Sequence, residues 1–265
     1  MIKLKDILLE STAPDIFIPR RIEGRVERLI RLYVRNGSKG GLRLNRVGLT
    51  KLPDILKDIT VGGEFDCSGN NLTSLVGAPK IISEDFNCND NHLTSLEFAP
   101  KSVGYSFQCG ENLLTSLQGA PKSVSGFFLC SRNKLTTLEG GPVEVGSSYL
   151  CSYNKLTTLK GSPTVIHGNF ICNNNSLITL EGGPVRIVHT NVYSTYRVRK
   201  NKIKSLVGAP TYVGGEFDVS NNSELESLEG IPKQVIGDFY CYNNKIEFTQ
   251  AQIRALCDVK GNVYV

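Results

Sequence analysis

Six cysteines recur every 21 residues in this 265-residue chain, and a thiol at a fixed interval is the first feature that could do chemistry. The series is Cys67, Cys88, Cys109, Cys130, Cys151 and Cys172, and Cys241 continues it later in the chain. Thiols can act as nucleophiles, pair as disulfides or ligate metals. Each role requires partners at a recognisable spacing, so the surrounding sequence decides among them.

The surroundings of the cysteines favour none of these roles. There is no Cys-x-x-Cys pair, and His92, His167 and His189 stand at unrelated phases of the repeat. Equivalent side chains of stacked repeats point in parallel, which is poor geometry for disulfides. The chain has no phosphate-binding loop, no paired catalytic carboxylates and no nucleophile with a base at a recognisable spacing. We expect reduced, buried cysteines, no metal or other cofactor, and no enzymatic activity.

The cysteines belong to a longer repeat that occurs about nine times. Residues 65–75 read FDCSGNNLTSL, and prolines also recur every 21 residues from Pro79 to Pro184. An Asn stands three residues after each cysteine place, at Asn70, Asn91, Asn112, Asn133, Asn154, Asn175, Asn201, Asn222 and Asn244. A repeat of this period predicts a solenoid.

The apolar places of one copy form a core that a single coil cannot bury. Phe65 and Cys67 lie two apart in a short strand and face one side, to which Leu72 and Leu75 return after the turn. In stacked coils each apolar residue lies on its counterpart about 4.8 Å away. The Asn stands where the chain leaves the strand, and its buried amide can satisfy the backbone groups freed at the bend.

With Phe or Leu, Cys or Leu, and Asn-x-Leu-Thr-x-Leu at fixed places, the repeat resembles the leucine-rich repeat. The Pro that follows makes it similar to the short repeats of bacterial effectors and related phage-encoded proteins. The resemblance covers residues 42 to about 248. It departs from those effectors in its 21-residue coil, in Phe and Cys at core places that are usually aliphatic, and in lacking the cysteine-based ligase domain of some members. The resemblance implies that the array of repeats serves as a binding surface.

We predict an α/β solenoid dominated by short parallel β-strands, an arc of about ten coils with its parallel sheet on the concave face. Residues 1–41 would form a basic helical N-terminal cap, residues 42–248 the leucine-rich repeat solenoid, and residues 249–265 a C-terminal cap. The spacer 54–63 is long enough for a helical turn on the convex side. In the C-terminal cap, Thr249 begins a short helix, and residues 258–265 are expected to form a small strand pair about Gly261.

Strand alternation predicts which residues face outward on the concave sheet. One such row is polar in its first half and apolar in its second, and consists of Asp66, Asn87, Gln108, Leu129, Leu150 and Ile171. A contiguous apolar patch on a concave sheet indicates a contact surface. We therefore predict that a partner binds to Phe127, Leu129, Leu150 and Ile171, with Arg132 and Tyr153 beside them. The alternatives are β-propensity on a surface strand and burial in a self-association contact.

The period breaks after Pro184, because the next proline, Pro210, follows 26 residues later. Insertions in solenoids map to loops, often on the binding face. We place the added length within residues 190–200 and, since aromatic residues and Arg are enriched in hot spots, expect partner contacts from Tyr193, Tyr196, Arg197 and Arg199. In this alignment Tyr193 stands at the position of the repeat that Cys67 and its counterparts occupy in other coils. A tolerated surface insertion is the alternative.

Positive charge is concentrated near the N-terminus. The net charge is +5, yet residues 20–46 alone contain nine Arg and Lys against two Glu. Apolar residues recur at helical spacing from Ile22 to Tyr33, and a basic surface lies largely on another face of this helix, at Arg21, Arg25, Arg28 and Arg35. A cap accounts for the helix. Nucleic acid or an acidic protein on its arginine face is the alternative.

Together these patterns predict a non-catalytic protein-binding module. The resemblance implies a phage or bacterial effector that binds a host protein or defence system. The alternatives are a nucleic-acid-associated protein acting through the basic helix, and a self-assembling structural component. No apolar run reaches the length of a membrane span, and Asp6 interrupts the stretch where a signal peptide needs apolar residues. We expect no membrane contact and a cytoplasmic location, in the host cell if the protein is phage-encoded.

Overall fold

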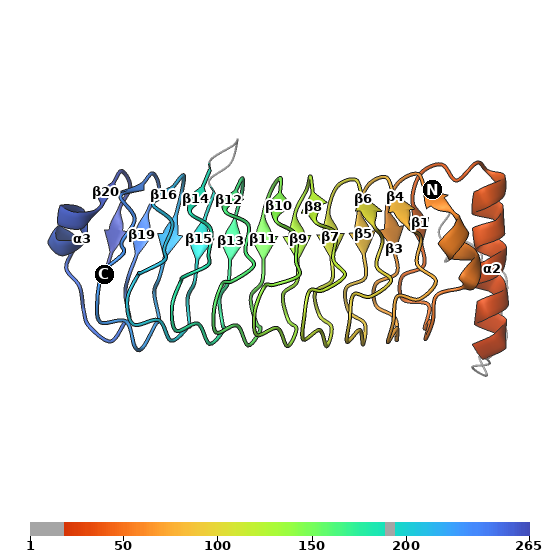
Figure 1. Cartoon of the computed structure of the whole chain (residues 1–265), viewed down its shortest axis with the longest axis horizontal. Helices are drawn as coiled ribbons and strands as arrows, with labels where there is room; N and C mark the ends of the chain where they lie inside the picture. The colour runs from red at the N-terminus through yellow and green to blue at the C-terminus, as the bar shows by residue number, and fades with distance from the viewer. Residues whose placement is uncertain (1–18, 189–193) are drawn as a thin grey trace, which may run out of the picture.

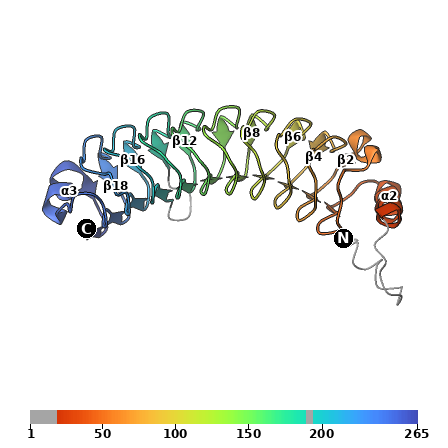
Figure 2. The same cartoon turned by 90° about the horizontal axis from the view of Figure 1, so that it is seen from below.

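The structure is a computed structural model that describes residues 19–188 and 194–265. The chain winds into a solenoid of about ten coils, with helix α2 (Pro19–Arg35) across one end and helix α3 (Gln250–Leu256) at the other (Figure 1). Seen from below, the coils form an arc (Figure 2). The predicted solenoid of parallel strands is confirmed.

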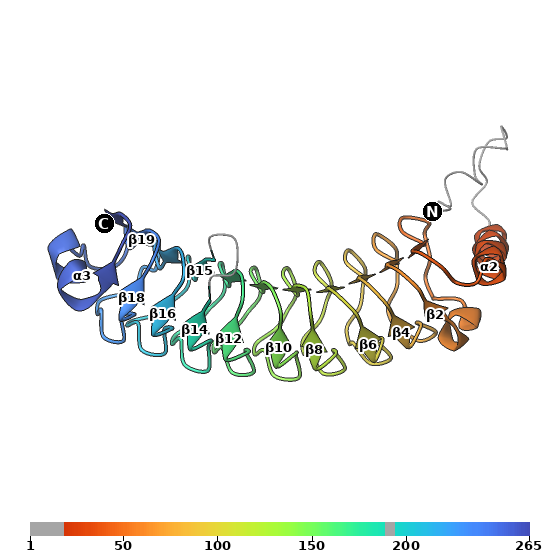
Figure 3. The same cartoon turned by 90° about the horizontal axis from the view of Figure 1, so that it is seen from above.

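An eleven-stranded parallel sheet follows the concave side of the arc, and neighbouring strands belong to successive coils (Figure 3). Its two-residue strands are β1 Leu42–Arg43, β3 Phe65–Asp66, β5 Phe86–Asn87, β7 Phe107–Gln108, β9 Phe128–Leu129, β11 Tyr149–Leu150, β13 Phe170–Ile171, β15 Tyr196–Arg197, β17 Phe217–Asp218, β19 Phe239–Tyr240 and β21 Val263–Tyr264. The register pairs identical places of the repeat, such as Phe65 with Phe86. Every row of side chains along the array therefore consists of equivalent residues.

The convex side carries three shorter parallel sheets instead of one. The first contains β2 Thr60–Val61, β4 Ile81–Ile82 and β6 Ser102–Val103, the second β8 Ser123–Val124 and β10 Glu144–Val145, and the third β12 Val165–Ile166, β14 Arg186–Ile187, β16 Tyr212–Val213, β18 Gln234–Val235 and β20 Asp258–Val259. Strands on the outside of an arc lie farther apart than those on the inside. The ladder is interrupted between β6 and β8 and between β10 and β12, because strand pairing tolerates only a narrow spacing of about 4.8 Å.

The core lies between the two faces and consists of ladders of like residues. From β3 to β19, the first residue of each concave strand is a Phe or Tyr. In this series, which begins at Phe65 and ends at Phe239, the ring centroids of neighbouring residues are separated by 5.0 to 6.0 Å. The cysteine ladder is buried and its thiols are free, as predicted. From Leu72 to Leu206, Leu72 and Leu75 and their counterparts complete each layer without exposed surface, whereas Ile246 in the last coil is 45% exposed.

The asparagine ladder ties each coil to the one before it. The Asn91 side-chain nitrogen donates to the carbonyl oxygens of Cys67 at 3.1 Å and Cys88 at 3.2 Å, and its oxygen accepts from the amide of Leu72 at 3.0 Å. The same bonds recur along the array, so the predicted role of these side chains is confirmed.

The N-terminal cap forms as its apolar spacing predicts. Helix α2 buries Val26, Leu29, Ile30 and Tyr33. The Tyr33 hydroxyl donates to the carbonyl oxygen of Ser38 at 2.6 Å and thereby holds the chain leaving the helix. The predicted helical turn of the long spacer is a 3-10 helix, η1 (Asp54–Asp58), which lies against α2.

The C-terminal cap differs from the prediction in one respect. Thr249 caps α3 through a capping box with Gln252, as expected. The two strands after it do not pair with each other: β20 pairs with β18, and β21 pairs with β19. The predicted strand pair is therefore wrong, and residues 258–264 instead add a strand to each side of the solenoid.

The register also corrects the alignment at the insertion. Tyr196 pairs with Phe170 in the concave sheet, so Val198, and not residue 193, occupies the cysteine place. All five added residues precede β15. The predicted contact residue Tyr193 lies outside the described residues.

Candidate functional site

Four apolar side chains gather at the middle of the concave sheet, and we call them the apolar cluster: Phe127, Leu129, Leu150 and Ile171. Leu129 is the Cα partner of Leu150, and Leu150 is that of Ile171, so the three lie side by side on consecutive strands. They face outward because the residues on either side of them, such as Phe128 and Cys130, are wholly buried. The apolar half of the sequence-predicted row is brought together as expected, and each of the four residues of the apolar cluster is half-buried.

Neighbouring groups explain this partial burial. A Cβ atom placed on Gly110 would lie 3.4 Å from the Leu129 Cγ, so the leucine leans over a glycine of the preceding coil. The Phe127 amide donates to the Ser106 hydroxyl oxygen at 3.2 Å, which fixes the backbone where Phe127 enters β9. Hydrogen bonds hold the backbone that carries this apolar surface, so we expect it to need little ordering to receive a partner.

Arg132 and Tyr153 follow β9 and β11 by the same number of residues and contact each other. The Arg132 guanidinium carbon lies 4.6 Å from the centroid of the Tyr153 ring. Both side chains are exposed. A cation–π pair of this kind is stabilised by about 0.5–1 kcal/mol at an exposed site. It gives the site a preformed aromatic and basic rim on the coils that carry Leu129 and Leu150.

Arg197 adjoins the apolar cluster, since it is the Cα partner of Ile171. Its Nε and Nη2 atoms donate to the two carboxylate oxygens of Glu216 at 2.7 and 2.8 Å. This bidentate hydrogen bond raises the pKa of Arg197. The predicted contact residue therefore lies at the edge of the site with its charge already paired, and it contributes shape and polarity more than free charge.

Arg199 lies beside a buried carboxylate. Its Nε atom is 3.4 Å from Asp218 Oδ2, and Nη2 donates to the Tyr242 hydroxyl at 3.4 Å. Burial raises the pKa of Asp218, while hydrogen bonds from the Ser220 hydroxyl and amide and the charge of Arg199 act in the opposite direction. Arg199 therefore balances a carboxylate that is almost removed from solvent.

Three tyrosines extend the site to the C-terminal end, and we call them the tyrosine cluster: Tyr240, Tyr242 and Tyr264. The rings of Tyr240 and Tyr264 stack with centroids 4.6 Å apart and planes 9° apart. Tyr242 meets Tyr240 edge to face at 6.4 Å. The sequence-based prediction missed this cluster, although the outward row from Asp66 to Ile171 reaches Tyr240 and Tyr264 when it is continued past the insertion.

Tyr196 was predicted to contact a partner from an exposed loop, and this is wrong. Its side chain is 0% exposed and stacks between Phe170 and Phe217, with centroids at 5.3 and 5.4 Å. The residue occupies the aromatic core place of its coil because the strand resumes one residue before Arg197. Burial raises the pKa of its hydroxyl well above the ordinary value.

The basic surface lies at the N-terminal end, away from the apolar cluster. Helix α2 includes Arg21, whose side chain lies outside the described residues, as well as Arg25, Arg28, Arg31 and Arg35. Arg25 is half-buried and the other three are exposed. In the part of the chain that the structure describes, no carboxylate lies within 4.0 Å of these four guanidinium groups.

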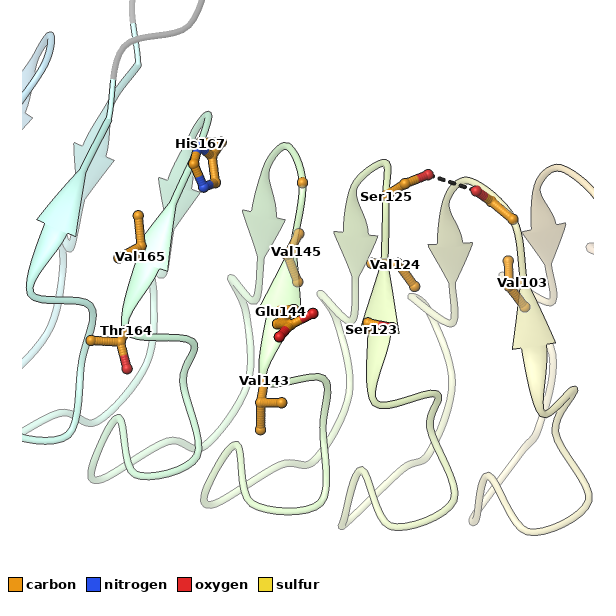
Figure 4. Close-up of a pocket in the computed structure, with 12 residues that line it drawn as sticks. Val103, Ser123, Val124, Ser125, Val143, Glu144, Val145, Thr164, Val165 and His167 are labelled. Atoms are coloured by element: carbon orange, nitrogen blue, oxygen red, sulfur yellow. Dashed lines mark hydrogen bonds between the residues drawn. The ribbon is translucent and has the colours of Figure 1, made fainter.

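A groove of about 690 Å³ occupies the convex side at the two interruptions of its ladder. Figure 4 shows the lining, which is dominated by valine and serine side chains from four neighbouring coils, with the Ser125 hydroxyl donating to the Gly104 carbonyl oxygen at 2.6 Å. His167 and Glu144 lie on different coils of this lining. The groove results from the spread of the convex strands.

The thiols are placed for packing and not for reaction. Burial raises the pKa of the ladder thiols Cys67, Cys88, Cys109 and Cys151 well above the ordinary value, and a thiol kept protonated is a poor nucleophile. Within residues 19–188 and 194–265, no three His, Cys, Asp or Glu side chains are grouped in a way that could hold a metal ion. None of the helices in those two ranges has the length and apolar character needed to cross a bilayer.

In comparisons with known proteins, the chain matches no protein-family model and no curated protein sequence.

Proposed function

We propose that this protein is a non-catalytic binding module that holds a protein partner on its concave surface, centred on the apolar cluster. The observation that carries the proposal is the adjacency of Leu129, Leu150 and Ile171 on three consecutive strands of one outward row. Contiguous apolar side chains that remain partly exposed on a concave sheet are typical of a contact site. The rim of Arg132 and Tyr153 and the tyrosine cluster supply the residue types that dominate binding energy at interfaces.

The class of partner is proposed from the repeat. Its Asn-x-Leu-Thr-x-Leu core followed by Pro resembles the leucine-rich repeats of bacterial effectors and phage-encoded proteins. By this analogy we propose that the partner is a host protein, such as a component of a defence system, and that the two meet in the host cytoplasm. Self-association through the same surface is the competing proposal.

The test compares two variants that carry the same added charge on the same row. Leu129→Asp with Leu150→Asp places two carboxylates in the apolar cluster, whereas Asn87→Asp with Gln108→Asp places two carboxylates on neighbouring strands of the polar half. Both variants change outward side chains, so circular dichroism and urea unfolding should show intact solenoids. Each is used with the wild-type chain to capture partners from host-cell lysate.

We expect the captured protein to be lost with the leucine variant and retained with the control. Loss of two apolar anchors should weaken binding by about 100-fold, equivalent to about 2.7 kcal/mol. Equal recovery by all three chains, or equal loss with both variants, would contradict a site centred on the apolar cluster. Self-association would appear as a sedimentation coefficient that rises with protein concentration. If the wild type and the control show this rise and the leucine variant does not, the partner is a second copy of the chain and not a host protein.

A further inference from the structure

The outer face of helix α2 carries a stripe of arginines that the proposed concave site does not use. Arg25, Arg28, Arg31 and Arg35 follow at intervals of three and four residues, which places them on one side of a helix. They extend over about 15 Å of the helix axis at 1.5 Å per residue. Figure 1 shows α2 as the terminal layer of the solenoid, and its apolar residues, such as Leu29 and Ile30, are buried against the coils. We call these four residues the arginine stripe. Arg28 and Arg35 are exposed, Arg25 is half-buried, and Arg31 is exposed at a hollow that Glu27 and Asp54 also line.

The stripe is not neutralised by its own chain. Seven basic groups elsewhere in the described residues are paired with carboxylates, as Arg43 is with Glu64 at 2.6 Å and Lys160 with Glu139 at 2.9 Å. No carboxylate of the described chain approaches any guanidinium of the stripe within 4.0 Å. Like charges at helical spacing destabilise a helix, and a cap needs only its apolar face. The charge of the stripe is therefore not needed for capping, and it is available to an external anion.

The geometry favours a phosphate backbone over an acidic protein. Arg presents a planar fork of donors that binds phosphate in two-point contacts, and successive arginines along a helix match a linear row of anions. A protein interface, by contrast, depends on apolar anchors at its centre. Two apolar residues of α2 between Arg25 and Arg35 are not buried. Leu32, which lies among the arginines, is half-buried, and Val34, which lies four residues after the buried Ile30, is 41% exposed.

We propose that the arginine stripe of α2 binds the sugar–phosphate backbone of nucleic acid without reading its base sequence. The binding is electrostatic and releases counterions from the nucleic acid. Four phosphate contacts give a slope of about −3.6 for the logarithm of the binding constant against the logarithm of salt concentration on duplex DNA. Affinity should then fall by about 100-fold between about 50 mM and about 200 mM salt.

The experiment measures fluorescence anisotropy of a labelled duplex of about 20 base pairs, and of a second duplex with the same composition in scrambled order, across this range of salt. The test variant changes Arg25, Arg28, Arg31 and Arg35 to Gln. Gln has nearly the same helix propensity as Arg, and the four side chains lie outside the buried face, so α2 should remain folded. The matched control changes four exposed lysines of the solenoid, Lys80, Lys101, Lys122 and Lys233, to Gln and removes the same charge.

We expect wild type and control to bind both duplexes equally with the stated slope, and the arginine variant to lose at least about 100-fold in affinity at low salt. The proposal is overturned by absence of binding to either duplex, by equal losses in the two variants, or by tighter binding of a polyglutamate peptide than of DNA at the same salt. The Leu129→Asp, Leu150→Asp variant should bind DNA like the wild type, so the outcome is independent of the concave site.

Discussion

The side-chain nitrogen of Asn112 lies 3.0 Å from the carbonyl oxygen of Cys88, a residue of the preceding coil. The same amide donates to the Cys109 carbonyl at 3.3 Å and accepts from the Leu93 amide at 3.0 Å. One buried side chain thus satisfies backbone groups of two coils that no water can reach.

Removing this amide should destabilise the whole array. Asn112→Ala leaves a buried N–H and buried carbonyl oxygens without a partner, and we expect the free energy of unfolding to fall by about 3 kcal/mol or more. Asn71→Ala is the control, because that side chain is exposed, and its effect should stay within about 0.5 kcal/mol. Urea unfolding followed by circular dichroism measures both. Similar losses in the two variants would show that the buried amide has no special role.

Two tyrosines in the aromatic ladder carry a hydroxyl that the core does not use. Among the described residues, no hydrogen-bond partner reaches the hydroxyl oxygens of Tyr149 and Tyr196. Replacement of either by Phe keeps the ring contacts and removes a buried polar group, so we expect a gain of about 1 kcal/mol in the free energy of unfolding.

The reverse change at Phe128, the neighbour of Tyr149 in the aromatic ladder, is the control for the two tyrosine variants. Phe128→Tyr should cost about 1–3 kcal/mol, since it adds a hydroxyl where the packing provides only apolar contacts. A loss of stability in Tyr149→Phe, measured by the midpoint of urea unfolding, would mean that its hydroxyl is satisfied in solution.

Phe98 has a left-handed backbone conformation at a position that glycine occupies in other coils. Its φ is +66°, whereas Gly77, Gly119 and Gly140 occupy the equivalent place with φ of +90°, +100° and +87°. The Phe98 side chain is 53% exposed, so little packing compensates the strain. Phe98→Gly should raise the melting temperature, with a net gain of about 0.5–1 kcal/mol after the greater freedom of the unfolded chain is subtracted.

Gly119→Ala tests the same place from the opposite direction. A Cβ atom there would lie 2.4 Å from the carbonyl oxygen of Leu96, so the coils would have to separate. We expect a loss of about 2 kcal/mol from strain and clash together. A neutral Gly119→Ala together with a destabilised Phe98→Gly would contradict the assignment of strain to this row.

The buried thiols make stability depend on pH in the alkaline range. Burial raises the pKa of Cys241 to about 12 and that of Cys257 to about 11. Above about pH 8.5 the thiols of the unfolded chain lose protons while the buried ones retain them, so the unfolded state binds fewer protons and stability falls as pH rises. Below that pH both states are protonated and the thiols contribute no slope.

Each such thiol adds up to about 1.4 kcal/mol per pH unit to this decline. Urea unfolding between about pH 7 and pH 11 should show a level region followed by a steep fall. Val198 and Val219 already occupy the cysteine position in their own coils, so Cys241→Val should be tolerated. It should reduce the slope of the free energy of unfolding against pH by the contribution of one thiol. An unchanged slope in this variant would assign the decline to other groups.

The solenoid was predictable because one set of contacts recurs in every coil. Each copy of the FDCSGNNLTSL pattern specifies the same inward Phe, Cys and Leu and the same buried Asn. A wrong assignment in one coil is therefore exposed by comparison with the neighbouring coils. The strand pair expected around Gly261 failed for the opposite reason. The local pattern of two short strands about a turn also fits a chain that crosses from one side of the solenoid to the other, and only the long-range partners of Val259 and Val263 distinguish the two.

The candidate site was predictable where the period is regular. Leu129, Leu150 and Ile171 were found by strand alternation, whereas the insertion shifted the register and led to Tyr196 being placed on the surface. Tyr240 and Tyr264 continue the outward row. Tyr240 was missed because the row was not extended to the coil of Cys241, and Tyr264 because residues 258–265 were expected to pair with each other. The convex groove could not be predicted, because it depends on the curvature of the whole array and not on any local pattern.

The interruptions of the convex ladder also determine how the arc responds to force. They separate β8 and β10 from the convex strands on either side, and these two strands belong to the coils that carry Leu129 and Leu150. At these junctions the coils are joined on the convex side by single hydrogen bonds, such as those from the Ser125 hydroxyl to the Gly104 carbonyl at 2.6 Å and from the Asn169 amide to the Ser148 hydroxyl at 2.9 Å, and not by a paired ladder. We therefore expect the array to bend more easily behind the apolar cluster than along the paired convex strands. A partner seated there can change the radius of the concave surface at a smaller elastic cost than a partner bound at either end.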